Sequence, residues 1–173
     1  MSLIKVKGSS IDGALAAVDG SALTGISAGK IVQTKMEGNY NWSGDASTNS
    51  TTYSGFGNEI TITPTSSSNA LLFMMDISDV YAPSGRAIHI NIKDKTNSTW
   101  VTGGETRNRT FGVGSIGDGI NTPFTLIDII ETAGSGARTY QGYFKSNASD
   151  TVYINNGGNK GYVRFCIMEV VKG

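Results

Sequence analysis

The stretch Ile88-His89-Ile90-Asn91-Ile92-Lys93 alternates strictly between isoleucine and a polar side chain. Successive side chains of a β-strand point to opposite faces, so this pattern places the three isoleucines together on one face. The stretch Glu59-Ile60-Thr61-Ile62-Thr63 shows the same alternation and stops at Pro64. Both stretches therefore predict β-strands.

The composition of the whole chain agrees with a β protein. Ile and Val together number 27 of the 173 residues, whereas Leu numbers only 6. β-branched side chains are stiff and suit a pleated surface, while Leu and Ala favour helices. Gly, Ser, Thr and Asn account for 73 residues, which predicts long polar loops between the strands.

The order of strand and turn signals predicts the architecture. About eight segments have strand character, separated by turns such as Pro83-Ser84-Gly85. They are residues 31–37, 59–63, 70–80, 88–93, 123–131, 138–146, 151–155 and 162–172. The first half of 70–80 is apolar enough to be buried on both faces. We expect an all-β fold, an antiparallel β-sandwich that is jelly-roll-like.

Residues 1–29 differ from the rest and are predicted to form an arm or stem, with 30–173 as the β-sandwich domain. A helix is expected to begin after Ser10 and to end at Gly20, with an apolar stripe on one side. A helix this short is marginal alone, so the stripe needs a partner, and a homotrimer would supply one. The candidate residues for a trimer or virion interface are Ile11, Leu15, Val18, Leu23 and Ile26.

Charge and chain-wide patterns argue against several functions. Lys and Arg number 14, as do Asp and Glu, so the formal net charge is zero. Neither nucleic acid nor an anionic membrane surface is an expected partner, because both attract a surplus of positive charge. No apolar run is long enough to span a membrane, and the N-terminal residues lack the apolar core of a signal peptide. Cys166 is the only cysteine and is expected to be a small buried hydrophobe.

Two short motifs match catalytic or cofactor patterns but lack the required context. Residues 112–117 match G-x-G-x-x-G, yet residues 118–123 cannot begin the helix that a dinucleotide needs. Residues 25–29 match G-x-S-x-G, and Asp76 or Asp79 and then His89 follow in the order of a hydrolase triad. The fold of such hydrolases requires helices that this sequence does not predict. We expect no enzyme, cofactor or metal site; an esterase centred on Ser27 is the weakest alternative.

Aromatic residues in a long polar loop are the best candidates for ligand binding. The loop at 38–57 contains Tyr40, Trp42, Tyr53 and Phe56 among Gly, Ser, Asn and Thr. Flat apolar rings beside small hydrogen-bonding groups suit sugars, and they also suit protein contacts. The alternative is that these rings only hold the loop against its own domain or a neighbouring subunit.

Several stretches together resemble tailed-bacteriophage virion proteins of the tail-fibre and decoration kind. They are residues 19–26, 28–33 and 61–72, and the C-terminal stretches 152–154 and 165–170. The resemblance implies a small trimeric β-domain on the outside of a virion, assembled in the host cytoplasm. It carries over no functional residues.

Two functions follow from this resemblance. The first is a tail-fibre-type host-attachment protein whose loops bind a cell-surface polysaccharide. The alternative is a capsid cement protein that stabilises the head by bridging major capsid subunits. The expected partners are further copies of the chain and other virion proteins, namely a tail adaptor or the major capsid protein.

Overall fold

The computed structural model describes residues 30–39, 46–101, 109–112, 120–130, 132–155 and 161–172. These residues form antiparallel β-strands in two sheets, and they contain no helix. The first sheet comprises β1 (Ile31–Asn39), β2 (Ala46–Thr48), β4 (Ala70–Ala82), β8 (Ile120–Ile130), β10 (Val152–Ile154) and β11 (Val163–Val170). The second comprises β3 (Ser54–Ile62), β5 (Ala87–Asp94), β6 (Thr99–Trp100), β7 (Arg109–Gly112) and β9 (Arg138–Ser146).

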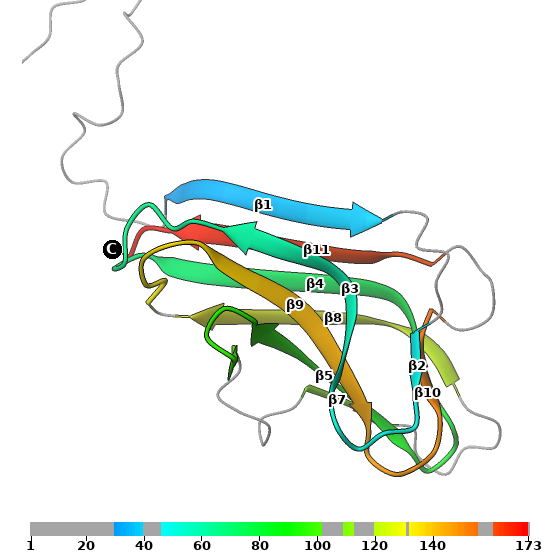
Figure 1. Ribbon diagram of the computed structural model, residues 1–173. Helices are drawn as coiled ribbons and strands as arrows, with labels where there is room; N and C mark the ends of the chain where they lie inside the picture. The colour runs from blue at the N-terminus through cyan, green and yellow to red at the C-terminus, as the bar shows by residue number, and fades with distance from the viewer. Residues whose placement is uncertain are drawn as a thin grey trace, which may run out of the picture.

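The two sheets lie face to face as a sandwich (Figure 1). Strands β1, β11, β4 and β8 lie side by side in the first sheet, and the short β10 and β2 continue from the far half of β4. In the second sheet β3, β9 and β5 are neighbours, and β6 and β7 both pair with the remaining edge of β5. The predicted all-β antiparallel sandwich is confirmed.

Every predicted strand corresponds to an observed one. The described residues contain three further strands, β2, β6 and β7, each of four residues or fewer. Segments this short carry too few residues to show a periodic pattern, which is why the sequence does not predict them.

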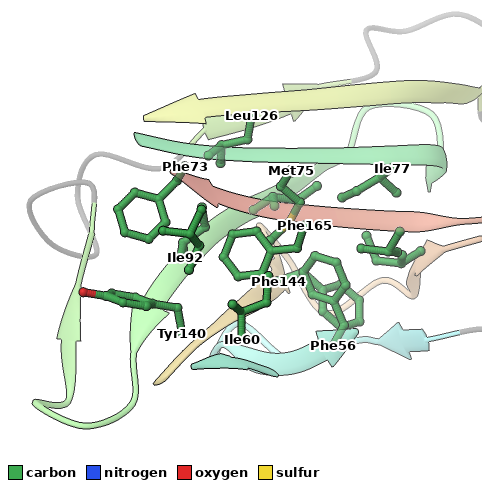
Figure 2. Packing of buried hydrophobic residues seen from close by; sticks show 14 of the residues in the cluster. Phe56, Ile60, Phe73, Met75, Ile77, Ile92, Leu126, Tyr140, Phe144 and Phe165 are labelled. Atoms are coloured by element: carbon green, nitrogen blue, oxygen red, sulfur yellow. The ribbon is translucent and has the colours of Figure 1, made fainter. Parts of the chain in front are cut away.

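The core lies between the two sheets (Figure 2). Phe73 and Phe165 of the first sheet point toward Tyr140 and Phe144 of the second. The ring centroids of Phe73 and Tyr140 are 4.9 Å apart in an edge-to-face arrangement. Ile88, Ile90 and Ile92 are 0% exposed, so the face predicted for the three isoleucines is the core face.

Two expectations from the sequence are wrong for the outer face of the first sheet. Strand β4 is not buried on both faces in its first half, because inward and outward residues alternate and Met74 is 37% exposed. Cys166 is not a core residue either: it lies between the buried Phe165 and Ile167 and is half-buried on the outer face. In both cases apolar side chains lie on the outer side of a strand, although their hydrophobicity alone predicts that they are buried.

A buried carboxylate joins β11 to the loop between β3 and β4. Glu169 is 0% exposed. It accepts hydrogen bonds from five donors: the amide of Gln33 (2.6 Å), the backbone N–H groups of Thr65 (2.8 Å) and Ser66 (3.2 Å), the Thr65 hydroxyl (2.8 Å) and the amide of Asn69 (2.6 Å). Burial alone would raise the pKa of Glu169, but these hydrogen bonds lower it from 4.5 to about 2.

One inward position of β9 requires glycine. A Cβ atom at Gly142 would lie 2.8 Å from Cε of Met75 and 2.9 Å from Cζ of Phe56. We expect Gly142→Val to lower the free energy of unfolding by about 1–3 kcal/mol, because the added methyl groups overpack the core. Urea unfolding followed by circular dichroism measures this. The control Thr139→Val, on the outer face of β9, should cost less than about 1 kcal/mol; equal losses would contradict the overpacking argument.

Candidate ligand-binding face

Five side chains gather on the outer face of the second sheet, the side away from the core. Tyr53 directly precedes β3, Lys93 is on β5, Trp100 is on β6, and Tyr143 and Lys145 are on β9. We call this set the aromatic face. The alternation that buries one side of β5 and β9 turns Lys93, Tyr143 and Lys145 outward, where they are half-exposed.

Strand pairing brings these residues together. Lys93 is the register partner of Trp100, and Asn91, two residues earlier on the same face of β5, is the partner of Tyr143. The ring centroids of Tyr53 and Trp100 are 4.6 Å apart, and those of Trp100 and Tyr143 are 5.5 Å apart. Three segments that are distant in sequence thus supply one continuous group of rings.

Two lysine ammonium groups lie over these rings. Nζ of Lys93 is 5.4 Å from the Trp100 centroid and 5.5 Å from the Tyr143 centroid. Nζ of Lys145 is 4.7 Å from the Tyr53 centroid. These distances are within the range of cation–π attraction, which holds each ammonium at the ring surface.

The charge of both lysines is available to a ligand. Among the residues that the structure describes, neither Lys93 nor Lys145 forms an ion pair with a carboxylate. The nearby Lys95 differs, because it pairs with Glu59. Within the described residues, the five side chains of the aromatic face therefore carry two positive charges, although the chain as a whole has no net charge.

His89 lies on the same side of β5, opposite Lys145 of β9. Its partial burial lowers the pKa of His89 below 6.5, and the positive charge of Lys145 lowers this pKa further. At neutral pH the imidazole is therefore uncharged, and the two lysines supply the positive charge of the face.

The candidate ligand-binding residues predicted from sequence fall into three groups. Tyr53 belongs to the aromatic face. Phe56 does not: it is 3% exposed and packs edge-to-face on Phe144 at 5.4 Å, so its ring belongs to the core and is not available to a ligand. It points inward because it occupies an inward position of β3. Tyr40 and Trp42 lie outside the described residues.

Sequence reasoning missed Trp100, Tyr143 and the two lysines. They lie on three different strands, and only the pairing of β5, β6 and β9 brings them together. One part of the site could have been predicted: Tyr143 and Lys145 are two positions apart in a predicted strand, so their side chains are expected on the same face.

Asp76 and His89, two residues of the hydrolase-triad pattern, lie on opposite sides of the sandwich. Asp76 is on the outer face of the first sheet, where it accepts a hydrogen bond from Thr125 (3.1 Å), whereas His89 is on the outer face of the second. The core separates them, so they cannot act as a pair. Ser27 and most of residues 112–117 lie outside the described part of the chain.

Two searches of the described residues gave negative findings. No group of three or more His, Cys, Asp or Glu side chains in these ranges is placed to hold a metal ion. None of the described segments forms a helix long and apolar enough to cross a membrane.

Comparison with known proteins gives little similarity. No family model and no curated protein sequence matches the chain. Among solved structures, the VP2 subviral particle of infectious bursal disease virus is similar over 83% of this chain and 39% of the VP2 chain, at 12% sequence identity and a TM-score of 0.26. A similarity this low supports no statement about function.

Proposed function

We propose that this protein is a non-enzymatic surface protein of a tailed-bacteriophage virion, of the tail-fibre type, and that its aromatic face binds an acidic polysaccharide of the host cell. The observation that carries the proposal is that two lysines, neither paired with a carboxylate among the described residues, lie directly on a group of half-exposed rings. The virion assignment rests on the sequence resemblance.

The chemistry of the face suits a sugar that carries carboxylates. Aromatic rings pack against the C–H faces of a pyranose, and half-exposed Trp and Tyr side chains are already partly fixed, so little entropy is lost on binding. An ammonium group attracts a carboxylate through a charge-assisted hydrogen bond. Lys93, held between Trp100 and Tyr143, places both kinds of contact within one sugar unit.

The strand order supports the finer fold assignment. Counting only the eight longer strands, the first sheet has the order β1-β11-β4-β8 and the second β3-β9-β5, with β7 on the far edge of β5. We propose that the sandwich is a jelly roll, an architecture used by viral capsid and lectin domains. The homotrimer stays a prediction; three copies would add avidity to a weak sugar contact.

The proposal predicts a preference for charged sugars. A β-1,4-mannuronate hexasaccharide is expected to bind more tightly than β-1,4-mannohexaose, its neutral counterpart, and to bind less tightly as salt is added. Trp100→Ala should weaken mannuronate binding by about tenfold or more, since truncating a central aromatic contact typically has this effect. Isothermal titration calorimetry measures all of these affinities.

A matched control keeps this test specific. Tyr153 is a half-exposed aromatic that packs edge-to-face on Tyr81, with ring centroids 5.7 Å apart, in the first sheet and away from the aromatic face. Tyr153→Ala should leave sugar affinity unchanged, whereas Lys93→Gln should shift mannuronate binding toward that of the neutral sugar, with Lys145 retaining part of the preference. Equal binding of the two sugars, or a Trp100→Ala variant that is folded and binds normally, would contradict the proposal.

A capsid cement protein is the second candidate, and one observation favours it. The outer face of the first sheet is apolar, as an interface with another virion protein would be. This role requires that face to be open to the partner. In this role residues 1–29 clamp the neighbouring capsid subunits, so phage heads assembled with protein lacking these residues should lose decoration and resist heat less well; normal decoration would exclude the clamp.

A further inference from the structure

The outer face of the first sheet carries two rows of mainly apolar side chains. Register pairs join Met36, Cys166, Met74 and Ile127 into one row across β1, β11, β4 and β8. The adjacent row contains Thr34, Met168, Leu72 and Ile129. We call these two rows the methionine face.

The exposure of this face is unusual within the molecule. In the described ranges, all large hydrophobic side chains that are strongly exposed lie on the first sheet or directly beside it. They are Ile31 (53%), Val32 (37%), Met36 (67%), Met74 (37%), Ile127 (53%), Ile129 (45%) and Val171 (38%). A contiguous apolar surface of this kind marks a contact site.

Polar residues close the methionine face at one end. Arg164, Asp76 and Thr125 form the next row, and Thr125 donates to Asp76. Between this row and the methionines lies a shallow apolar depression of about 260 Å³, lined in part by Met36, Met74 and Cys166. A side chain that inserts into this depression would contact mainly apolar atoms.

The first described residue, Lys30, lies beside this face. Residues 1–29 precede Lys30, whose carbonyl accepts a hydrogen bond from the backbone N–H of Val171 (2.9 Å). The next two residues, Ile31 and Val32, are exposed hydrophobics on the edge strand. Lys30, to which residues 1–29 are connected, therefore lies at the border of the methionine face.

We propose that residues 1–29 of the same chain lie on the methionine face and cover it, with Ile11, Leu15 and Val18 against the two apolar rows. The sequence predicts this stripe to need a partner, and sister copies were the expected partner. The methionine face offers one within the chain. Flexible Met side chains adapt to such a contact without requiring a fixed shape.

Length and charge both permit this arrangement. Four adjacent strands span about 14 Å between the outermost axes, and a helix over about ten residues is about 15 Å long. The connection at 20–29 can extend to about 33 Å, more than enough to reach the centre of the sheet. Two lysines and two aspartates balance within residues 1–29, and both aspartates lie off the apolar stripe.

Connection within one chain favours this occupant over a second copy. A tethered segment has an effective local concentration in the millimolar range, whereas a separate copy must be gathered from dilute solution. Coverage within the chain is therefore independent of protein concentration. Coverage by another copy is lost on dilution.

Cys166 gives a direct readout, because it is the only cysteine and lies in the centre of the methionine face. The experiment compares the rate at which Ellman's reagent modifies this thiol in the full chain and in protein lacking residues 1–29. We expect the truncated protein to react about tenfold faster or more, since the segment must open before the thiol is reached. The rate in the full chain should not change over a hundredfold dilution.

Point variants test whether the apolar stripe, and not the rest of residues 1–29, slows the modification of Cys166. Leu15→Glu should raise the rate toward that of the truncated protein, whereas Ala16→Glu, which adds the same charge on the opposite side of the predicted helix, should not. Equal rates for the full and truncated chains would overturn the proposal. Protection that disappears on dilution would also overturn it, and would identify a second copy as the occupant.

Discussion

Replacing Glu169 with glutamine is expected to lower the free energy of unfolding by about 2–4 kcal/mol. Five donors converge on this buried carboxylate. A glutamine side chain keeps the volume but directs its own N–H₂ group toward donors, so several buried N–H and O–H groups lose their acceptor. Urea unfolding of both proteins at pH 7 measures the difference.

The same carboxylate predicts how stability depends on pH. Because folding lowers the pKa of Glu169 from 4.5 to about 2, its contribution is fully present above pH 4.5 and is lost as the pH falls toward 2. Wild-type stability should therefore decline more steeply across this window than that of Glu169→Gln. Parallel curves for the two proteins would show that Glu169 is not held as a buried anion.

Glu59 provides the control. It is an exposed carboxylate on β3 that pairs with Lys95, and a surface pair of this kind contributes less than about 1 kcal/mol. We expect Glu59→Gln to change stability only slightly. A loss as large as that of Glu169→Gln would mean that removal of negative charge, and not loss of the hydrogen-bond network, causes the effect.

Replacing Phe73 with alanine is expected to lower the free energy of unfolding by about 3–5 kcal/mol. Phe73 is 0% exposed and contacts the rings of Tyr140 and Phe165, so it joins the two sheets at the centre of the core (Figure 2). Truncation leaves a cavity that neighbouring rings cannot fill without moving a strand. Denaturant unfolding at neutral pH provides the measurement.

Phe73→Leu tests the origin of that loss. Leucine retains much of the volume but removes the edge-to-face contact with Tyr140, which is worth about 0.5–1.5 kcal/mol. We expect this variant to lose roughly half as much stability as Phe73→Ala or less. Equal losses for both variants would indicate that the aromatic contact, and not the cavity, dominates.

The sequence predicts the strands because alternation is a local property. Ile88, Ile90 and Ile92 need no other segment to show which side of β5 is buried. Hydrophobicity alone does not reveal which apolar face is covered: it predicts burial for the first half of 70–80 and for Cys166, although Met74 and Cys166 face outward. Their outward positions follow only once β11 and β4 are known to be neighbours with the second sheet on one side.

The candidate site depends on contacts between distant segments, which one sequence does not reveal. Tyr53 and Phe56 were grouped because they are close in the chain, yet an odd spacing places them on opposite sides of the sheet. Trp100 and Tyr143 are 43 positions apart and meet only through the pairing of β5 with β6 and β9. For Glu169 the sequence gives part of the answer, because alternation with Phe165 and Ile167 indicates that its side chain points inward. The sequence does not show which groups donate hydrogen bonds to it, because these come from distant segments.

The aromatic face and the methionine face lie on opposite sides of one thin core, and this gives the molecule a front and a back. If the molecule is anchored through its methionine face, or through a segment that lies on this face, the lysines and rings of the aromatic face point away from the anchor. Display of the aromatic face would then need no hinge, because the two faces of the sandwich point in opposite directions.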